Sequence, residues 1–331
     1  MLQAPVSGSF YSAFVGYHGM DVTAAGRRAF LKALGGGAAG LVLGRHALAA
    51  PAPAAGLSLQ PLTDNLTLVS GAGGNVVALG SPDGMLLVDC GAPEHTPALL
   101  AALAGLPGGR RVTQVFNTHW HWDHTGANER LHQAGASILA HENTRLWLGT
   151  TVWEEWQNRS YPPRPRSALP DKTVYTSGSL TFAGEPVEYG YLAQAHTDGD
   201  LYVHLRRANV LVAGDVVSVG RYPLSDYSTG GWIGGMVDAT QKLIDLSDDK
   251  TRIVPGTGPV QRRADLIAAH DMLASLKESL WQLMRKGMNA DDWIAMDVTR
   301  EYDAKWGNPQ LFLNTTYRGL YAHVREMRGV V

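Results

Sequence analysis

The chain has 331 residues, of which 45% are hydrophobic and 18% are charged, so it can bury one large core together with an appendage. Its formal net charge is −2, which gives no support to nucleic-acid binding through a basic face. The single cysteine, Cys90, excludes an internal disulfide and a cysteine-rich zinc site. A metal ion would therefore have to be held by histidine and carboxylate side chains.

The first 49 residues have the features of an export signal. Arg27 and Arg28 precede a mild apolar run over residues 33–43, and small residues end the segment at Ala49. The run is too short and too rich in glycine to span a bilayer, whereas the small residues suit a signal peptidase. The segment resembles a twin-arginine signal, so we expect a leader over residues 1–49 and a periplasmic or otherwise exported product. Its partner would be the export machinery, with no stable membrane anchor after processing.

An alternative for this segment is an amphipathic first helix of the folded domain, but the three glycines at 35–37 would break such a helix. Residues 1–19 contain no Lys, Arg, Asp or Glu, so Met20 competes with Met1 as the true start. Cleavage after Ala49 would leave a net charge of about −5, which again argues against a nucleic-acid partner.

A linker of proline and alanine over residues 50–60 precedes the expected domain. From Leu66 to Cys90, apolar runs separated by glycine turns and by the Asp83-Gly84 hairpin signal predict a meander of strands. Strand and helix patterns then alternate, which brings parallel strands into the sheet. The expected order is helix 99–103, strand 112–116, helix 127–133 and strand 137–140, followed by strands 180–182, 187–191, 201–205 and 210–213.

The most informative stretch is His119-Trp120-His121-Trp122-Asp123-His124, which follows the strand that ends at Phe116. In extended chain, side chains two residues apart point the same way, so His119 and His121 can hold one ion together. Asp123 and His124, one step along a turn, can then face a second ion. The alternative is a histidine-rich loop held only by hydrogen bonds. It is disfavoured because such ligand types seldom lie so close together without a metal.

The pattern H-x-H-x-D-H resembles the signature of the metallo-β-lactamase-fold hydrolases. This resemblance implies an α/β (α+β) fold, an αββα sandwich over residues 61–260, with a C-terminal helical extension over 261–331. It also implies that His196 is the third histidine of the first metal site and that Asp215 is a carboxylate bridging two metals. Asp89 would support the metal loop from behind the ligands, although a strand-end aspartate capping the next helix is an alternative.

One position departs from the family pattern. The sequence Pro255-Gly256-Thr257-Gly258 stands where the family usually reads Pro-Gly-His-Gly. A hydroxyl is a far poorer ligand than an imidazole, so we expect Thr257 to lie beside the metal site without binding strongly. The site would hold one or two zinc ions, the second weakly.

Residues 147–171 lose their periodicity and gather Trp153, Trp156 and Tyr161 among prolines. We expect a flap that covers the substrate, with a proline-stiffened surface loop as the alternative. Beyond residue 260, apolar residues recur at helical spacing and predict the helical extension. The pocket walls would come from the flap, the glycine-rich loop at 230–235 and this extension, in which Trp306, Tyr317 and Tyr321 are more typical of core packing.

Together these features predict an exported zinc-dependent hydrolase of a small-molecule substrate. Three imidazoles leave an open position on the ion for a water that becomes a nucleophile at neutral pH. Asp123 and Asp215 would orient this water and accept its proton. The reaction would be hydrolysis of an ester, thioester, lactone or lactam.

Three alternatives stay open. The fold and a periplasmic address suit a β-lactamase proper, but the lactamases of this superfamily generally lack a carboxylate at the place of Asp215. A site with two histidines and one aspartate also suits a single iron, as in the related persulfide dioxygenases. The third alternative is a metal-binding protein without catalytic activity.

Overall fold

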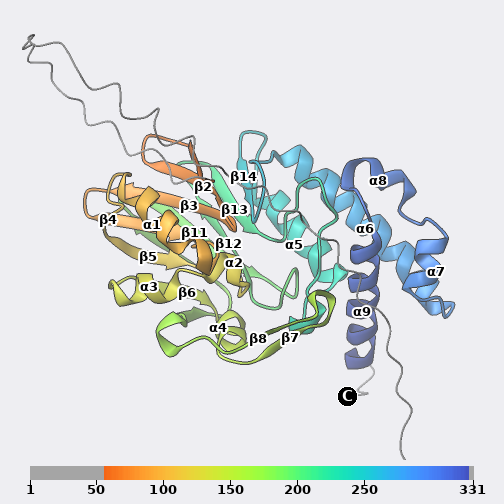
Figure 1. Ribbon diagram of the computed structural model, residues 1–331. Coiled ribbons are helices and arrows are strands. Elements are labelled where there is room, and N and C mark those ends of the chain that lie inside the picture. Colours follow the sequence, from red (N-terminus) through yellow and green to blue (C-terminus); the bar gives the residue numbers. More distant parts are fainter. Residues whose placement is uncertain (1–55, 328–331) are drawn as a thin grey trace, which may run out of the picture. The chain divides into compact units, whose positions relative to one another are not determined.

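Two β-sheets form the centre of residues 56–327, the part of the chain that this computed structural model describes (Figure 1). The first sheet has seven strands in the order β1-β2-β3-β4-β5-β6-β9. Its first four strands form an antiparallel meander, and the others join β4 in parallel. The strands are β1 (Ser58–Pro61), β2 (Leu66–Ala72), β3 (Gly74–Ser81), β4 (Gly84–Val88), β5 (Val112–Phe116), β6 (Ser137–His141) and β9 (Lys172–Val174).

The second sheet has five strands in the order β10-β11-β12-β13-β14. Its strands are antiparallel except for the pair β13 and β14, which is parallel. This pair is connected through a helix, as a parallel connection requires. The strands are β10 (Ser177–Phe182), β11 (Glu185–Leu192), β12 (Asp200–Leu205), β13 (Val210–Gly214) and β14 (Arg252–Pro255).

The strands at the centre of both sheets are apolar on both faces because both faces are covered. Every residue of β3 is buried, and successive side chains of a strand point to opposite faces. Val76 and Ala78 face one cluster together with Leu99 of the helix α1 (Thr96–Ala104). Val77 and Leu79 face the other cluster, together with strands of the second sheet. The continuous apolar runs of the sequence therefore mark strands between two layers.

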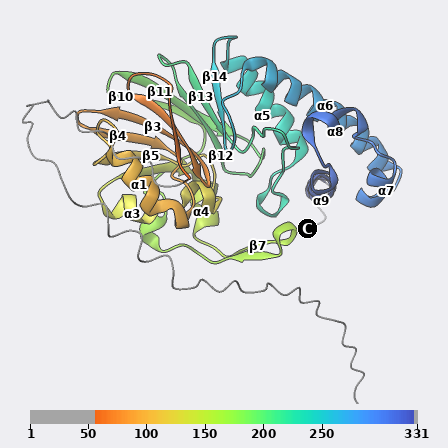
Figure 2. The same ribbon diagram turned by 45° about the horizontal axis from the view of Figure 1, so that its top comes forward.

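Helices cover the outer face of each sheet, so that the fold has four layers (Figures 1 and 2). Four helices accompany the first sheet: α1 (Thr96–Ala104), α2 (Trp122–Thr125), α3 (Asn128–Gln133) and α4 (Glu142–Leu148). The helices α5 (Ile233–Leu246) and α6 (Arg263–Arg285) cover the second sheet. This arrangement confirms the predicted αββα sandwich.

The predicted C-terminal helices are present as well. They are α7 (Ala290–Ala295), α8 (Arg300–Trp306) and α9 (Gln310–Met327). Phe312 and Leu313 of α9 belong to the same buried cluster as residues of α5 and α6. The extension is therefore packed on the sandwich through a shared core.

The segment after α4 is more regular than its sequence suggests. It forms a two-stranded hairpin of β7 (Val152–Glu154) and β8 (Arg159–Tyr161), joined by the short 3-10 helix η2 (Glu155–Gln157). Three further 3-10 helices are η1 (Pro93–His95), η3 (Arg166–Ala168) and η4 (Tyr227–Thr229). Strands of three residues are too short for a periodicity to show in the sequence.

The expected leader over residues 1–49 lies outside the described residues, as do residues 50–55 of the expected linker. The export signal therefore stays a prediction. Within residues 56–327, no helix combines the length and the apolar character needed to cross a membrane.

Asn75 joins the two sheets through a nearly buried side chain. Its Nδ2 donates hydrogen bonds to the carbonyl oxygens of Pro255 and Gly258, both at 2.9 Å. Its Oδ1 accepts a hydrogen bond from Ser70 at 2.7 Å, and its backbone N–H donates to Gly256 at 2.7 Å. The loop after β14 is thus held against the first strands of the domain.

We expect the Asn75→Ala variant to lower the free energy of unfolding by about 2–4 kcal/mol, because a buried carbonyl oxygen loses its donor. Urea denaturation followed by circular dichroism measures this change. Asn314→Ala is the matched control, since the Asn314 side chain donates to Gln310 at 2.9 Å on the exposed face of α9. The control should change stability by less than about 0.5 kcal/mol. Equal losses in the two variants would contradict the bridging role of Asn75.

Candidate metal centre

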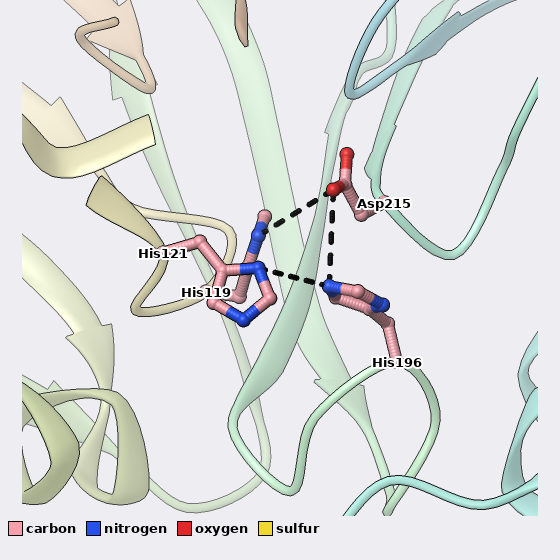
Figure 3. A group of neighbouring side chains, drawn as sticks. All are labelled: His119, His121, His196 and Asp215. Atoms are coloured by element: carbon pink, nitrogen blue, oxygen red, sulfur yellow. Dashed lines mark hydrogen bonds and ion pairs between the residues drawn. The ribbon is translucent and has the colours of Figure 1, made fainter. Parts of the chain in front are cut away.

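Three loops bring the predicted metal ligands to one edge of the sandwich. His119 and His121 follow β5, His196 lies between β11 and β12, and Asp215 comes directly after β13. Figure 3 shows these four side chains pointing toward one another, with His119 and His121 on one loop and His196 and Asp215 on two others. Each offers one ligand atom, and these atoms all lie within 4.8 Å of one another. The chain therefore gathers three imidazoles and a carboxylate around a single point.

The distances in this group fit a divalent ion. His121 Nδ1 and His196 Nε2 lie 3.1 Å apart, and Asp215 Oδ2 lies 3.9 Å from His119 Nε2 and 3.8 Å from His196 Nε2. Ligand atoms about 2.1 Å from a shared zinc ion lie about 3–4 Å from each other. His119 Nε2 is buried and has no hydrogen-bond partner among the described residues. An ion would supply the missing partner.

Each imidazole is held by a hydrogen bond on its other nitrogen. His119 Nδ1 lies 3.0 Å from the hydroxyl of Thr118, and His196 Nδ1 lies 2.9 Å from the carbonyl oxygen of Leu224. His121 Nε2 lies 3.2 Å from Asp226 Oδ2. Such partners fix the ring orientation and the tautomer, which leaves the remaining nitrogen free to bind an ion.

Asp123 and His124 lie on the other side of Asp215. His124 Nε2 is 3.4 Å from Asp215 Oδ1 and 3.8 Å from Asp123 Oδ2. Asp89 lies behind them, with its Oδ2 at 2.8 Å from His124 Nδ1. Thr257 contributes no ligand that could replace an imidazole, because its hydroxyl accepts a hydrogen bond from Arg221 at 2.9 Å. Among residues 56–327, the second group thus has three donors and no fourth.

A pocket opens over both groups. Its floor contains His121, Asp123, His196 and Asp215, and its walls come from the hairpin after α4, the loop after β13 and the start of α9. The wall residues are Trp156, Gln157, Tyr161, Ser218, Arg221, Tyr222, Leu224, Asn308, Leu311 and Phe312. The pocket is thus lined by side chains from distant parts of the chain.

The structure corrects part of the expected pocket wall. Trp156 and Tyr161 of the expected flap line the pocket, but Trp153 is 53% exposed and does not. The glycine-rich loop at 230–235 packs behind His196, because a Cβ on Gly231 would lie 2.1 Å from the His196 carbonyl oxygen. Glycines at this place allow the backbone to support the ligand loop from below, a role that composition alone does not show.

Known proteins place the chain in a family. The sequence model of the Metallo-beta-lactamase superfamily matches residues 69–286, which is more than half of the chain. The chain belongs to this superfamily. Members of the superfamily bind metal ions, in agreement with the cluster of histidine and aspartate side chains.

Similar proteins agree with this assignment. A metallo-beta-lactamase type 2 of Bacillus cereus is 24% identical over 199 residues, which are 60% of this chain and 72% of the relative. A hydroxyacylglutathione hydrolase of Nitrosococcus oceani is 53% identical over 38 residues, 11% of this chain and 14% of the relative.

Two solved structures share the fold. A metallo-beta-lactamase from Pontibacter korlensis has a TM-score of 0.53 and 19% identity, covering 66% of this chain and 99% of that chain. One from Erythrobacter litoralis has a TM-score of 0.51 and 17% identity, covering 67% of this chain and 98% of that chain.

The imidazoles of this superfamily site differ in their electrostatic surroundings. Burial, together with the neighbouring His124 and His121, holds the pKa of His119 well below its usual value. Burial and His121 also lower the pKa of His196. Both rings are therefore neutral at physiological pH, and the neutral ring is the form that binds metal.

Nearby carboxylates raise the pKa of the other two imidazoles, those of His121 and His124. Burial opposes protonation of His121, but the hydrogen bond and charge of Asp226 outweigh it and raise the pKa of His121 to about 9. Burial likewise opposes protonation of His124, yet Asp123, Asp215 and Asp89 hold the pKa of that ring well above its usual value. A metal ion must compete with these protons, so its affinity rises with pH.

Two buried acids near His121 were not predicted from the sequence. Asp226 holds the His121 ring and also accepts hydrogen bonds from the hydroxyl of Thr229 and the backbone N–H of Ser228. Glu154, at the end of β7, is fully buried, and neither of its carboxyl oxygens has a hydrogen-bond partner among residues 56–327. His121, Glu154 and Asp226 offer ligand atoms within 4.8 Å of one another. Burial and the charge of Asp226 raise the pKa of Glu154 to about 8.

This pKa makes stability depend on pH. Between about 4.5, the ordinary value, and about 8, folded metal-free protein keeps a proton on Glu154 that the unfolded chain releases. The unfolded state then binds fewer protons, so stability falls as pH rises through this range. The Glu154→Gln variant lacks this dependence, and its Tm should rise relative to the unaltered chain as pH increases from about 4.5 to about 8.

Differential scanning calorimetry of both proteins across this pH range measures the difference in Tm. Glu301→Gln is the control, because Glu301 is exposed on α8 and should follow the unaltered chain at every pH. A constant Tm difference between the Glu154 variant and the unaltered chain would show that folding does not raise the pKa of Glu154.

Proposed function

We propose that this chain is a zinc-dependent hydrolase of a small-molecule ester, thioester, lactone or lactam. The observation that carries the proposal is the convergence of His119, His121, His196 and Asp215 on one point at the floor of a pocket. An ion held there would lower the pKa of a bound water to about 7 and polarise a carbonyl oxygen. A set dominated by histidines, with no cysteine, is typical of catalytic rather than structural zinc.

The chain's own side chains would position the reactants. Asp215 Oδ2 faces His119 and His196, where a carboxylate can orient a water by hydrogen bonding. Asp123 is half-exposed at the pocket floor and can accept the proton that this water loses. Leu311, Phe312 and Trp156 would contact the hydrocarbon part of a substrate. These walls restrict the approach of bulk water to the reacting carbonyl.

The comparisons support a hydrolase without naming its substrate. One relative bears the name of a lactamase and another that of a hydrolase of an acylated compound. For this chain, the acyl substrate is part of the proposal. We also propose export through the twin-arginine-like leader at residues 1–49, supported by Arg27 and Arg28 ahead of the apolar run.

We expect the purified chain to contain zinc and to hydrolyse at least one compound in a panel of esters, thioesters, lactones and lactams. The His119→Ala variant should lose metal and reduce turnover by more than about 100-fold, because an ion ligand is removed. Mass spectrometry of metal content and initial rates on the panel measure both effects. His95→Ala, which lies outside the site, should keep both.

The metal content also separates the alternatives. Iron together with oxygen uptake would favour an oxidoreductase over the proposed hydrolase. Zinc bound without turnover of any compound in the panel would favour a metal-binding protein. Equal metal content in the His119→Ala variant and the unaltered chain would place the ion elsewhere.

A β-lactam substrate is the second candidate, because the match to the Bacillus cereus lactamase extends over 72% of that relative. If the substrate is a β-lactam, we expect the protein to hydrolyse the chromogenic β-lactam nitrocefin in the presence of zinc. The same reaction with His121→Ala serves as the background. Turnover equal to this background would exclude the lactamase.

A further inference from the structure

Arg221 extends into the metal pocket and is held there by the residue that departs from the family pattern. Its Nη2 donates a hydrogen bond to Thr257 Oγ1 at 2.9 Å. Arg221 lies in the loop after β13 and Thr257 in the loop after β14, so both loops follow parallel neighbouring strands. Arg221 lines the same pocket as Asp123 and Asp215.

The loop of Thr257 is fixed close to the second group of metal donors. Gly256 packs so tightly against Asp215 that a Cβ on it would lie 1.7 Å from Asp215 Oδ1. The backbone N–H of Gly256 also donates to the Gly214 carbonyl at 2.7 Å. Asp215 Oδ1 in turn lies 3.4 Å from His124 Nε2. Thr257 therefore directly follows, in the sequence, the glycine that packs against Asp215 of the second group.

The second group does not fit an ion as well as the first. It offers Asp123, His124 and Asp215. The residue at the sequence position of the family's last histidine is Thr257, whose hydroxyl accepts a hydrogen bond from a guanidinium. A fixed positive charge in the same pocket also opposes binding of a second cation. Across residues 56–327, no carboxylate forms an ion pair with Arg221. The other N–H groups of its guanidinium have no hydrogen-bond partner among these residues.

We propose that Arg221, positioned by Thr257, takes the place of a second metal ion. The site then holds one ion, and the free face of the guanidinium binds an anionic group of the substrate, such as a carboxylate. A planar guanidinium matches a carboxylate with two parallel hydrogen bonds, which an ammonium cannot do. This inference rests on the proposed hydrolase function and assigns the charge of its substrate.

The first test counts ions. Metal-free full-length chain is titrated with zinc, and bound zinc per chain is measured by mass spectrometry. We expect one tightly bound equivalent for the unaltered chain and two for the double variant Thr257→His with Arg221→Ala. Thr257→Val, which removes the hydroxyl without adding a ligand, should still bind one. Two tightly bound zinc ions per unaltered chain, or only one per double variant, would contradict the proposal that the guanidinium replaces a second metal ion.

The second test measures charge recognition. Two panel substrates with the same reacting group are compared, one neutral and one bearing a carboxylate. The Arg221→Ala variant should raise KM for the anionic substrate by about 10–100-fold more than it raises KM for the neutral one. Arg221→Lys should recover part of this loss, since it keeps the charge but not the planar geometry. Equal changes for both substrates would refute anion binding by Arg221.

The two failures are distinguishable. If the unaltered chain takes up no zinc and hydrolyses nothing, the proposed function itself is wrong. If it takes up zinc and hydrolyses a substrate, but the Arg221 variants do not discriminate between the charged and the neutral compound, only the role of Arg221 is wrong.

Discussion

The geometry of the metal centre depends on one buried carboxylate, that of Asp89. It is 1% exposed, and it accepts hydrogen bonds from the backbone N–H of Thr118 at 2.7 Å and from the Thr118 hydroxyl at 2.8 Å. Because this hydroxyl donates to Asp89, it must accept from His119 Nδ1, which leaves His119 Nε2 as the free ligand atom. Asp89 also faces His124 Nδ1 and frees its Nε2 in the same way. A φ of 61° at Asp89 shows that the backbone itself is bent to make these contacts.

Close packing of the two sheets sets the remaining distances. The backbone N–H of Leu201 in β12 donates to the Thr118 carbonyl at 2.7 Å, so the histidine loop of the first sheet is tied to a strand of the second. A Cβ on Gly214 would lie 2.8 Å from Thr118 Oγ1, closer than side chains allow. Glycine at this position lets Asp215 approach the histidines. The ligand cluster is therefore a property of the sandwich, and disturbing the contact between the sheets would disperse it.

Much of this arrangement can be predicted from the sequence, and the limits have physical causes. The strands and the strand–helix alternation follow from apolar runs and turn signals, whereas the αββα sandwich is implied by the resemblance to a known family. The stretch from His119 to His124 indicates a metal because its ligand types are dense. His196 and Asp215 carry no such local signal and could be selected only through their order in a known family. Glu154 and Asp226 carry none at all, because each lies in an ordinary sequence and meets His121 only after folding. Roles for all of these side chains rest on the proposed function.

The consequence of having Thr257 in place of a histidine is likewise hard to predict from the local sequence. It depends on Arg221, which lies 36 positions away and donates a hydrogen bond to Thr257. Considered without its neighbours, threonine at this position indicates only that the second ion site is weakened. Considered together with Arg221, it indicates that a guanidinium supplies the positive charge in place of the second ion. The two sources are not equivalent. A metal ion can be withdrawn by a chelator and binds oxygen atoms from many directions, whereas a guanidinium is permanent and prefers planar, bidentate anions. A site with one ion and one arginine would therefore separate its tasks, with the ion acting on the carbonyl and the arginine selecting the substrate by charge.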